Sequence, residues 1–178
     1  MSKVITFSRN FQKSHPKAGE PTHFVDKIWK WYYDECAGDV RDLLWYNEQY
    51  DNIFGVDEMK NIHNFNPKLH TIRGGERFNV GDWFSPRIWT GKPYSSKQLE
   101  IAPLIQVKQV FPINVLVQNF GKLGLQAVIS INGKDFTNID LLARNDGLSQ
   151  QDFLSWFESK KGETFCGQII CWSDEVSY

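Results

Sequence analysis

The sequence predicts an α+β fold in which a small β-barrel of about five or six strands carries flanking helices. Short apolar runs separated by Gly, Pro and Asn turns fill the chain from Leu69 onward, which is typical of a small closed or partly closed barrel. Apolar residues recur at helical spacing near residues 23–35 and 149–160, which predicts helices at the edges of that barrel. The chain has 178 residues, of which 41% are hydrophobic and 15% aromatic, so it can bury the core of a single domain over 1–178.

The first third of the chain is expected to contain one strand and two helices. The apolar run Lys3–Ser8 predicts the strand. Thr22 is a good N-cap for the helix over 23–35, and a second helix is expected to follow Asp39. The polar, Asn-rich stretch 51–67 is expected to be a long loop with a short helix inside it.

Turn residues divide the rest of the chain into strands. Pro103 and Pro112 restrict the neighbouring strands to edges or bulges, because proline donates no backbone hydrogen bond. Asn132-Gly133 is the strongest hairpin signal in the chain. Short helices are expected over 138–145 and from the N-cap Ser149 onward. The expected strands cover residues 69–73, 83–90, 98–101, 106–111, 114–120, 125–131 and 167–172.

The overall composition excludes several classes of protein. Twenty basic and 21 acidic residues give a net charge of −1, so the chain lacks the general basic character of a bulk nucleic-acid binder. No run of 18 apolar residues predicts a transmembrane helix, and no signal-like segment opens the chain, so we expect a cytoplasmic protein that does not enter the membrane. The three cysteines and four histidines lack the spacing of a metal site, so neither a metal nor another cofactor is expected.

Charge is distributed unevenly along the chain. Two basic blocks, at 1–19 and 60–97, flank an acidic block at 34–58. Aromatic residues interleave with the second basic block, and aromatic rings beside Lys and Arg are how proteins hold the bases of single-stranded nucleic acids. Because Trp89 and Tyr94 border turn residues, they are the candidates for stacking. The candidates for contacts with phosphate are Arg87, Lys92 and Lys97.

The segments 67–73 and 78–82 together resemble the signature of the ASCH family, which belongs to the PUA-like superfamily of small barrels. The matching residues are Lys68, Thr71, Arg73 and the turn Gly81-Asp82. Further similar segments occur at 7–9, 15–22, 143–149 and 152–157, in the family's order. The resemblance covers about two thirds of the chain and implies a PUA-like barrel, with residues 34–67 as an insertion.

One group of similar proteins, the bacterial amidohydrolases that deacetylate acetylcytidine, implies a catalytic trio. Lys68 and Thr71 match that pattern in identity and spacing, whereas Asp146 stands where the family has a Glu. In this reading Thr71 attacks the acyl carbonyl, Lys68 accepts its proton and Asp146 assists departure of the amine. Residues three apart in a strand point to opposite faces, so Lys68 and Thr71 meet only if the backbone bends between them.

The remaining polar residues of the matching segments predict the rest of the site. Arg73 has the planar guanidinium that recognises an anion or carboxylate. Glu20 and Thr22 are placed at the rim of the barrel mouth by the resemblance, where Glu20 could read the exocyclic amine of a base.

Three functions remain open from the sequence. The favoured one is binding of RNA or a modified nucleobase or nucleoside in a polar pocket at the barrel mouth. The second is an amidohydrolase that removes an acyl group from the exocyclic amine of a nucleoside such as acetylcytidine. The third is a protein-interaction module of phage or mobile-element origin, whose partner would bind the acidic insertion.

Overall fold

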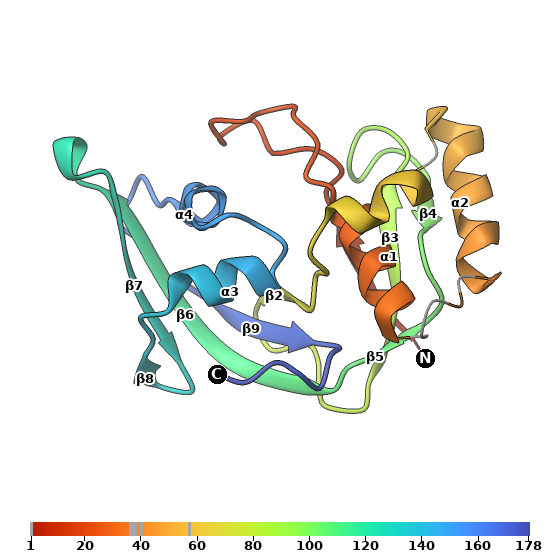
Figure 1. Cartoon of the computed structure of the whole chain (residues 1–178). Helices are drawn as coiled ribbons and strands as arrows, with labels where there is room; N and C mark the ends of the chain where they lie inside the picture. Colours follow the sequence, from red (N-terminus) through yellow and green to blue (C-terminus); the bar gives the residue numbers. More distant parts are fainter. Residues whose placement is uncertain (1, 36–38, 40, 57) are drawn as a thin grey trace. The chain divides into compact units, whose positions relative to one another are not determined.

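The computed structural model describes residues 2–35, 39, 41–56 and 58–178 of the chain (Figure 1). Its described elements are four α-helices, two 3₁₀-helices and nine strands in two sheets, which confirms the α+β class. The chain divides into two compact units. Unit 1 comprises Met1–Lys13, Lys17–Lys68 and Asp82–Gln106, and unit 2 comprises Ser14–Pro16, Leu69–Gly81 and Val107–Tyr178.

The sheet of unit 1 is built on a parallel pair of strands. β1 (Lys3–Phe7) runs parallel to β3 (Trp83–Trp89), and Phe7 lies opposite Ile88. Two short strands, β4 (Gln98–Glu100) and β5 (Ile105–Gln106), pair with β3 in the antiparallel sense. Because β1 and β3 are parallel, both end at the same edge of this sheet.

Two α-helices pack in unit 1. At the start of α1 (Phe24–Glu35), Phe24 N donates to Thr22 Oγ1 at 3.4 Å, but the first bond within the helix runs from Lys27 N to His23 O at 3.0 Å, so His23 is the N-cap and the prediction of Thr22 is wrong by one residue. Trp29 of α1 donates its indole N–H to the carbonyl oxygen of Ile101, and its ring lies 5.8 Å edge-to-face from Tyr50 of α2 (Arg41–Phe54). The helix expected over 23–35 is therefore confirmed.

The loop expected over 51–67 is wrong at its start, which is helical, whereas the short helix expected inside it is observed. α2 continues to Phe54, where the Tyr50 and Phe54 rings lie 4.7 Å apart, and a 3₁₀-helix, η1, covers Glu58–Asn64. The Asn-rich composition concealed this part of the helix, although the i, i+4 spacing of the two aromatic residues is a helix signal.

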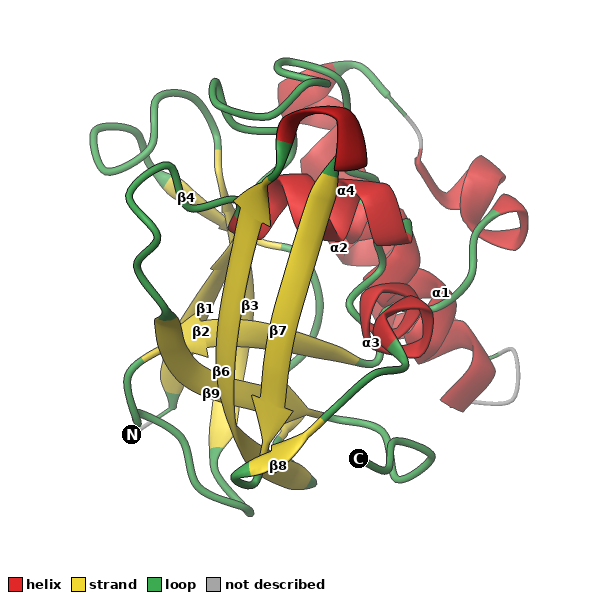
Figure 2. Cartoon of the chain, turned by 90° about the vertical axis from the view of Figure 1, so that its left-hand side faces the viewer, coloured by secondary structure: helices red, strands yellow, loops and turns green. Residues whose placement is uncertain are grey.

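The sheet of unit 2 is antiparallel throughout, with the order β2-β9-β6-β7-β8 (Figure 2). Asn132 and Gly133 have φ angles of 53° and 73° and join β7 to β8. Both angles are positive, as a type I′ hairpin turn requires, so the hairpin prediction is confirmed. The strands are β2 (His70–Gly74), β6 (Gln109–Asn119), β7 (Leu125–Ile131), β8 (Lys134–Asp135) and β9 (Phe165–Cys171).

Pro112 lies inside β6, which is an inner strand, so the expectation that proline confines this region to a sheet edge is wrong. β6 also replaces the two separate strands expected at 106–111 and 114–120. Pro112 is accommodated because β6 begins pairing with β7 only at Ile113, so that Pro112 has just one neighbouring strand, β9.

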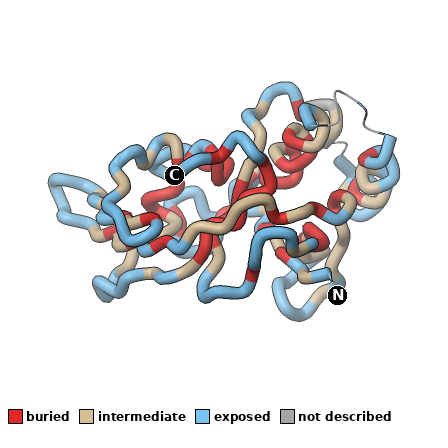
Figure 3. The backbone as a smooth tube through the Cα atoms, turned by 90° about the horizontal axis from the view of Figure 1, so that it is seen from below, coloured by how far each residue is buried: buried red, intermediate tan, exposed pale blue. Residues whose placement is uncertain are grey.

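Both helices of unit 2 begin after a capping side chain, of which Ser149 was predicted as a cap and Asn138 as the first residue of its helix. Asn138 Oδ1 accepts from Leu141 N at 3.1 Å before α3 (Ile139–Asn145), and Ser149 Oγ accepts from Asp152 N at 3.1 Å before α4 (Gln150–Phe157). Leu142 and Ala143 of α3 and Phe153 and Leu154 of α4 are buried. Figure 3 shows in red where buried residues occur along the backbone. Both helix predictions are confirmed, although α4 ends earlier than residue 160.

Over their described strands, both sheets are open: neither pairs its first strand with its last. The α+β class therefore stands as observed. Closure of the strands into one PUA-like barrel stays a prediction, as do the single domain over 1–178 and the insertion at 34–67.

Gly167 is the residue of unit 2 that tolerates a side chain least. A Cβ at this position would lie 2.1 Å from the carbonyl oxygen of Arg73 on the neighbouring strand. We expect Gly167→Ala to lower the free energy of unfolding by about 2–3 kcal/mol, because the backbone of β2 must move. Urea unfolding followed by circular dichroism measures this loss.

The matched control is Gly74, which lies opposite Gly167 in the same strand pair. A Cβ there would first meet the Phe165 ring at 3.7 Å, an ordinary contact. Gly74→Ala should therefore change stability by less than about 1 kcal/mol. Equal losses in the two variants would show that close backbone approach is not what keeps glycine at position 167.

Candidate functional site

A groove of about 380 Å³ opens in unit 1 at the edge where β1 and β3 both end. The segment leaving β1 forms one wall, and the segment leaving β3 forms the other. Parallel strands commonly deliver the chain to a ligand site at this edge of a sheet. The lining residues are Phe7, Ser8, Arg9, Asn10, Phe11, Gln12, Lys13, Trp89, Thr90, Gly91 and Pro93.

Of the two predicted stacking residues, Trp89 lines the groove, and Tyr94, which follows the lining residue Pro93, lies against Trp89. The rings of Trp89 and Tyr94 have centroids 5.5 Å apart and are tilted by 52°. Tyr94 is 90% exposed and has a φ of 64°, a backbone conformation that non-glycine residues seldom adopt. Residues with a strained backbone conformation are found most often at functional sites, and here the strained residue carries an exposed aromatic ring.

The β3–β4 loop that carries these rings is held by its own hydrogen bonds. Thr90 N donates to Lys97 O at 2.9 Å, closing the base of the loop. Inside it, Gly91 N donates to Ser96 Oγ at 2.9 Å, and Ser96 Oγ donates to Lys92 O at 3.0 Å. A loop fixed in this way loses little conformational entropy when a ligand binds.

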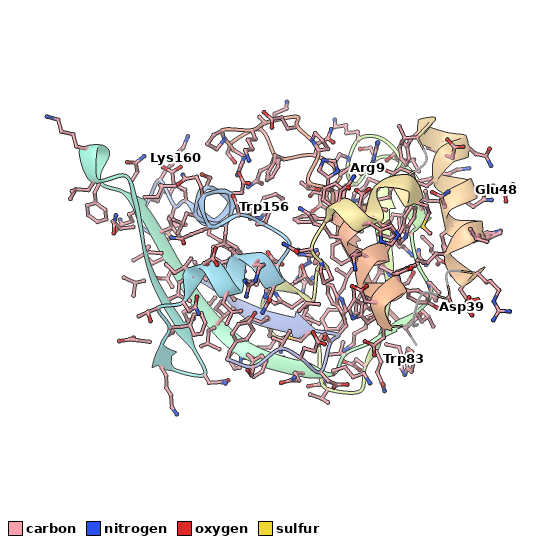
Figure 4. The ribbon with its side chains drawn as sticks, viewed as in Figure 1. Arg9, Asp39, Glu48, Trp83, Trp156 and Lys160 are labelled. Carbon is pink, nitrogen blue, oxygen red and sulfur yellow. The ribbon has the colours of Figure 1, made fainter. Side chains whose placement is uncertain are left out.

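The opposite wall presents two cations, Arg9 and Lys13. The Arg9 guanidinium lies 3.5 Å from the centre of the Phe54 ring, and its Nε donates to Tyr50 Oη at 3.1 Å (Figure 4). That hydrogen bond uses one of the five N–H donors of a guanidinium. The sequence prediction missed both residues as site residues, although they belong to the first basic block.

The charge of the groove is positive. Of the described residues that line it, none is acidic, and Lys92 lies between the lining residues Gly91 and Pro93. Arg87, by contrast, donates to Glu100 Oε1 at 2.6 Å and to Ser85 Oγ at 3.0 Å. Its charge is therefore already paired within the sheet, which leaves Lys92 as the better candidate for a phosphate contact.

The two predicted rim residues support the wall of the groove. Thr22 is buried, and its hydroxyl donates to Ser8 O at 2.6 Å. The carbonyl oxygen of Glu20 accepts from Phe11 N at 2.9 Å, while the residue itself is exposed. Both residues thus brace the segment that leaves β1.

The residues of the predicted catalytic trio belong to different units. Lys68 is in unit 1, where its backbone N–H donates to Lys27 O at 3.0 Å and its Nζ lies 4.3 Å from the centre of the Phe24 ring. Thr71 and Asp146 are in unit 2, together with Arg73. Convergence of Lys68 with the other residues of the trio therefore stays a prediction.

Within unit 2, strand alternation separates the motif residues. Thr71 lies opposite Ile170 and His70 opposite Cys171, so the side chains of His70 and Thr71 leave opposite faces of β2. The His70 ring is the one that lies near Asp146, with 3.7 Å between Nδ1 and Oδ1. Arg73 shares the face of Thr71 and donates through Nη1 to Ile72 O at 3.2 Å.

His70 and Asp146 belong to a buried cluster that the sequence prediction did not identify. The Tyr178 ring lies edge-to-face 5.6 Å from His70, and Tyr178 Oη accepts from Asn145 Nδ2 at 3.1 Å. Burial, with a smaller contribution from the charge of Asp146, raises the pKa of Cys171 to about 12. Burial likewise raises the pKa of Tyr178. Both groups are uncharged at neutral pH, so the cluster offers no thiolate nucleophile.

No protein-family model, curated protein or solved structure matches this chain. Within the described residues, no three His, Cys, Asp or Glu side chains are grouped so that they could hold a metal ion. In the same part of the chain, no helix is both long and apolar enough to cross a bilayer. The function of this chain is therefore inferred from the geometry of the groove.

The pKa of Cys171 predicts how the thiols react. Cys166 is exposed and Cys171 is buried. Near pH 8, only about one Cys171 side chain in ten thousand would be ionised at a pKa of about 12. In a Cys36→Ser background, which removes the cysteine outside the described residues, an aromatic disulfide reagent should modify one thiol in the native protein and two in guanidinium chloride. Rapid modification of both native thiols would contradict this.

Proposed function

We propose that this protein binds single-stranded RNA or another nucleobase-containing ligand in the groove of unit 1. The observation that carries the proposal is the pair of rings, Trp89 and Tyr94, held on a braced loop across from Arg9 and Lys13. Stacking on such rings contributes about 1–3 kcal/mol per base. The cations on the two walls supply the contacts with phosphate.

Polar side chains on the wall formed by residues 8–13 complete the chemistry that a base requires. Ser8, Asn10 and Gln12 are exposed and line the groove. Their hydroxyl and amide groups both donate and accept hydrogen bonds, so they can pair with the edge of a stacked base. The groove thus combines stacking, base-edge and phosphate contacts.

The resemblance to the ASCH family supports the same class of ligand. We also propose that the chain belongs to that family and that its strands close into a PUA-like barrel. Lys68, Thr71, Arg73 and Gly81-Asp82 carry the resemblance. Of the residues that line the groove, Phe7, Ser8 and Arg9 belong to a family-like segment, whereas the stacking residue Trp89 and the cation Lys13 do not. Variants of Trp89 and Lys13 therefore test binding independently of the family.

The two rings give the sharpest test of binding. We expect Trp89→Ala and Tyr94→Ala each to weaken the affinity for a fluorescent oligouridine by about tenfold to a hundredfold, because each removes a stacking surface. Fluorescence anisotropy at low salt measures the affinity. The affinity of the wild type should fall as salt rises, because phosphate contacts release counterions.

Trp83 is the matched control for these variants. It is 47% exposed and starts β3, whereas Trp89 ends the strand, so it lies away from Arg9 and the groove (Figure 4). Trp83→Ala should leave the affinity unchanged. If the wild type binds no oligonucleotide at low salt, or if all three variants bind equally well, the groove is not a nucleobase site.

A second candidate function, hydrolysis of an acylated nucleoside, is favoured by the burial of Lys68. Lysines are rarely fully buried, and buried lysines are a source of catalytic bases. Lys68→Ala and Thr71→Ala should each abolish release of acetate from acetylcytidine, measured by chromatography, whereas Lys97→Ala on the exposed β3–β4 loop should not. A wild type that releases no acetate would exclude this activity on acetylcytidine.

A further inference from the structure

Within the described part of the chain, helix α2 is buried on one side only. Leu43 and Tyr50 are buried, and Tyr50 makes the ring contact with Trp29 of α1. The opposite side, here called the outer face of α2, consists of exposed residues at the matching helical positions. These residues are Leu44, Trp45, Glu48, Asp51 and Asn52.

The outer face of α2 displays large apolar side chains. Leu44 and Trp45 are each 55% exposed. The Trp45 ring lies 4.9 Å edge-to-face from Tyr46, which holds the indole against the helix. An exposed, pre-positioned Trp is the residue type that most often anchors a protein interface.

The charge around this face is negative. Glu48 lies one turn from both Leu44 and Trp45 and points outward from the helix, and Asp51 follows one turn later (Figure 4). Arg41, at the first position of α2, donates to Asp39 Oδ2 at 2.6 Å. This hydrogen bond holds the pKa of Asp39 at about 2, so the charge of Arg41 is neutralised there.

The charge also discriminates between possible occupants of the face. Nucleic acid and the anionic surface of a bilayer carry the same sign of charge as Glu48 and Asp51 and would be repelled. In a two-fold dimer formed through this face, the same patch would meet itself, and like charges would oppose one another. A positively charged protein segment with its own apolar side has the complementary chemistry.

We propose that the outer face of α2 is a docking site for a basic amphipathic helix of a partner protein. Trp45 and Leu44 bury against the apolar side of that helix, and Glu48 and Asp51 pair with its Lys or Arg side chains. This surface is separate from the nucleobase groove and adds a second, protein-binding function to the chain.

The test uses a fluorescent peptide of about 18 residues, made of Leu and Lys in a helical amphipathic pattern. We expect it to bind the wild type saturably in an anisotropy titration. Trp45→Ala, and separately Glu48→Lys combined with Asp51→Lys, should each weaken binding about tenfold or more. Because these side chains are exposed, the variants should keep the circular dichroism spectrum of the wild type.

Three controls define the outcome. A Leu–Glu peptide of the same pattern should not bind, and Trp83→Ala and Trp89→Ala should bind the Leu–Lys peptide like the wild type. If Trp45→Ala and the double variant Glu48→Lys, Asp51→Lys bind the Leu–Lys peptide as tightly as the wild type, the proposal is wrong. Loss of binding in Trp89→Ala would also overturn it, because that result would place the peptide in the groove. Sedimentation showing a dimer that Trp45→Ala dissolves would assign the face to a second copy of this chain instead.

Discussion

The parallel pairing of β1 with β3 is the contact on which the organisation of unit 1 depends. Parallel neighbours cannot be joined by a tight turn, so the chain between Phe7 and Trp83 must cross over before it can pair again. α1 and α2 lie within that crossover and bring Trp29 and Tyr50 together. The same pairing makes β1 and β3 end at one edge, so the segments leaving them become the two walls of the groove.

Each wall of the groove is stabilised by contacts that leave its ligand-facing groups in place. On one wall, the Arg9 guanidinium lies over the Phe54 ring of α2, and the Thr22 hydroxyl donates a hydrogen bond to the carbonyl oxygen of Ser8. On the other, the hydroxyl of Ser96 bridges the β3–β4 loop. Hydrogen bonds and ring contacts thus hold polar and aromatic groups in fixed positions at the surface. This is the preorganisation that binding sites require.

Charge is segregated in three dimensions as it is along the chain. Parts of the two basic blocks meet at the groove, where Arg9 and Lys13 line the wall across from the loop that carries Lys92. The acidic block supplies α2, whose outer face carries Glu48 and Asp51. A net charge near zero therefore conceals two surfaces of opposite sign, each suited to a different class of partner.

The sequence by itself determined the features that rest on neighbouring residues. The helix cap at Ser149 and the turn at Asn132-Gly133 were predictable because a cap or a tight turn needs only a few adjacent residues. Tertiary structure decided which segments pair: the register of β2 with β9 placed His70 against Cys171, and the parallel pairing of β1 with β3 brought Arg9 to the groove. Such pairings join residues far apart in the chain, and their free energy comes from packing and backbone hydrogen bonds that no local pattern encodes.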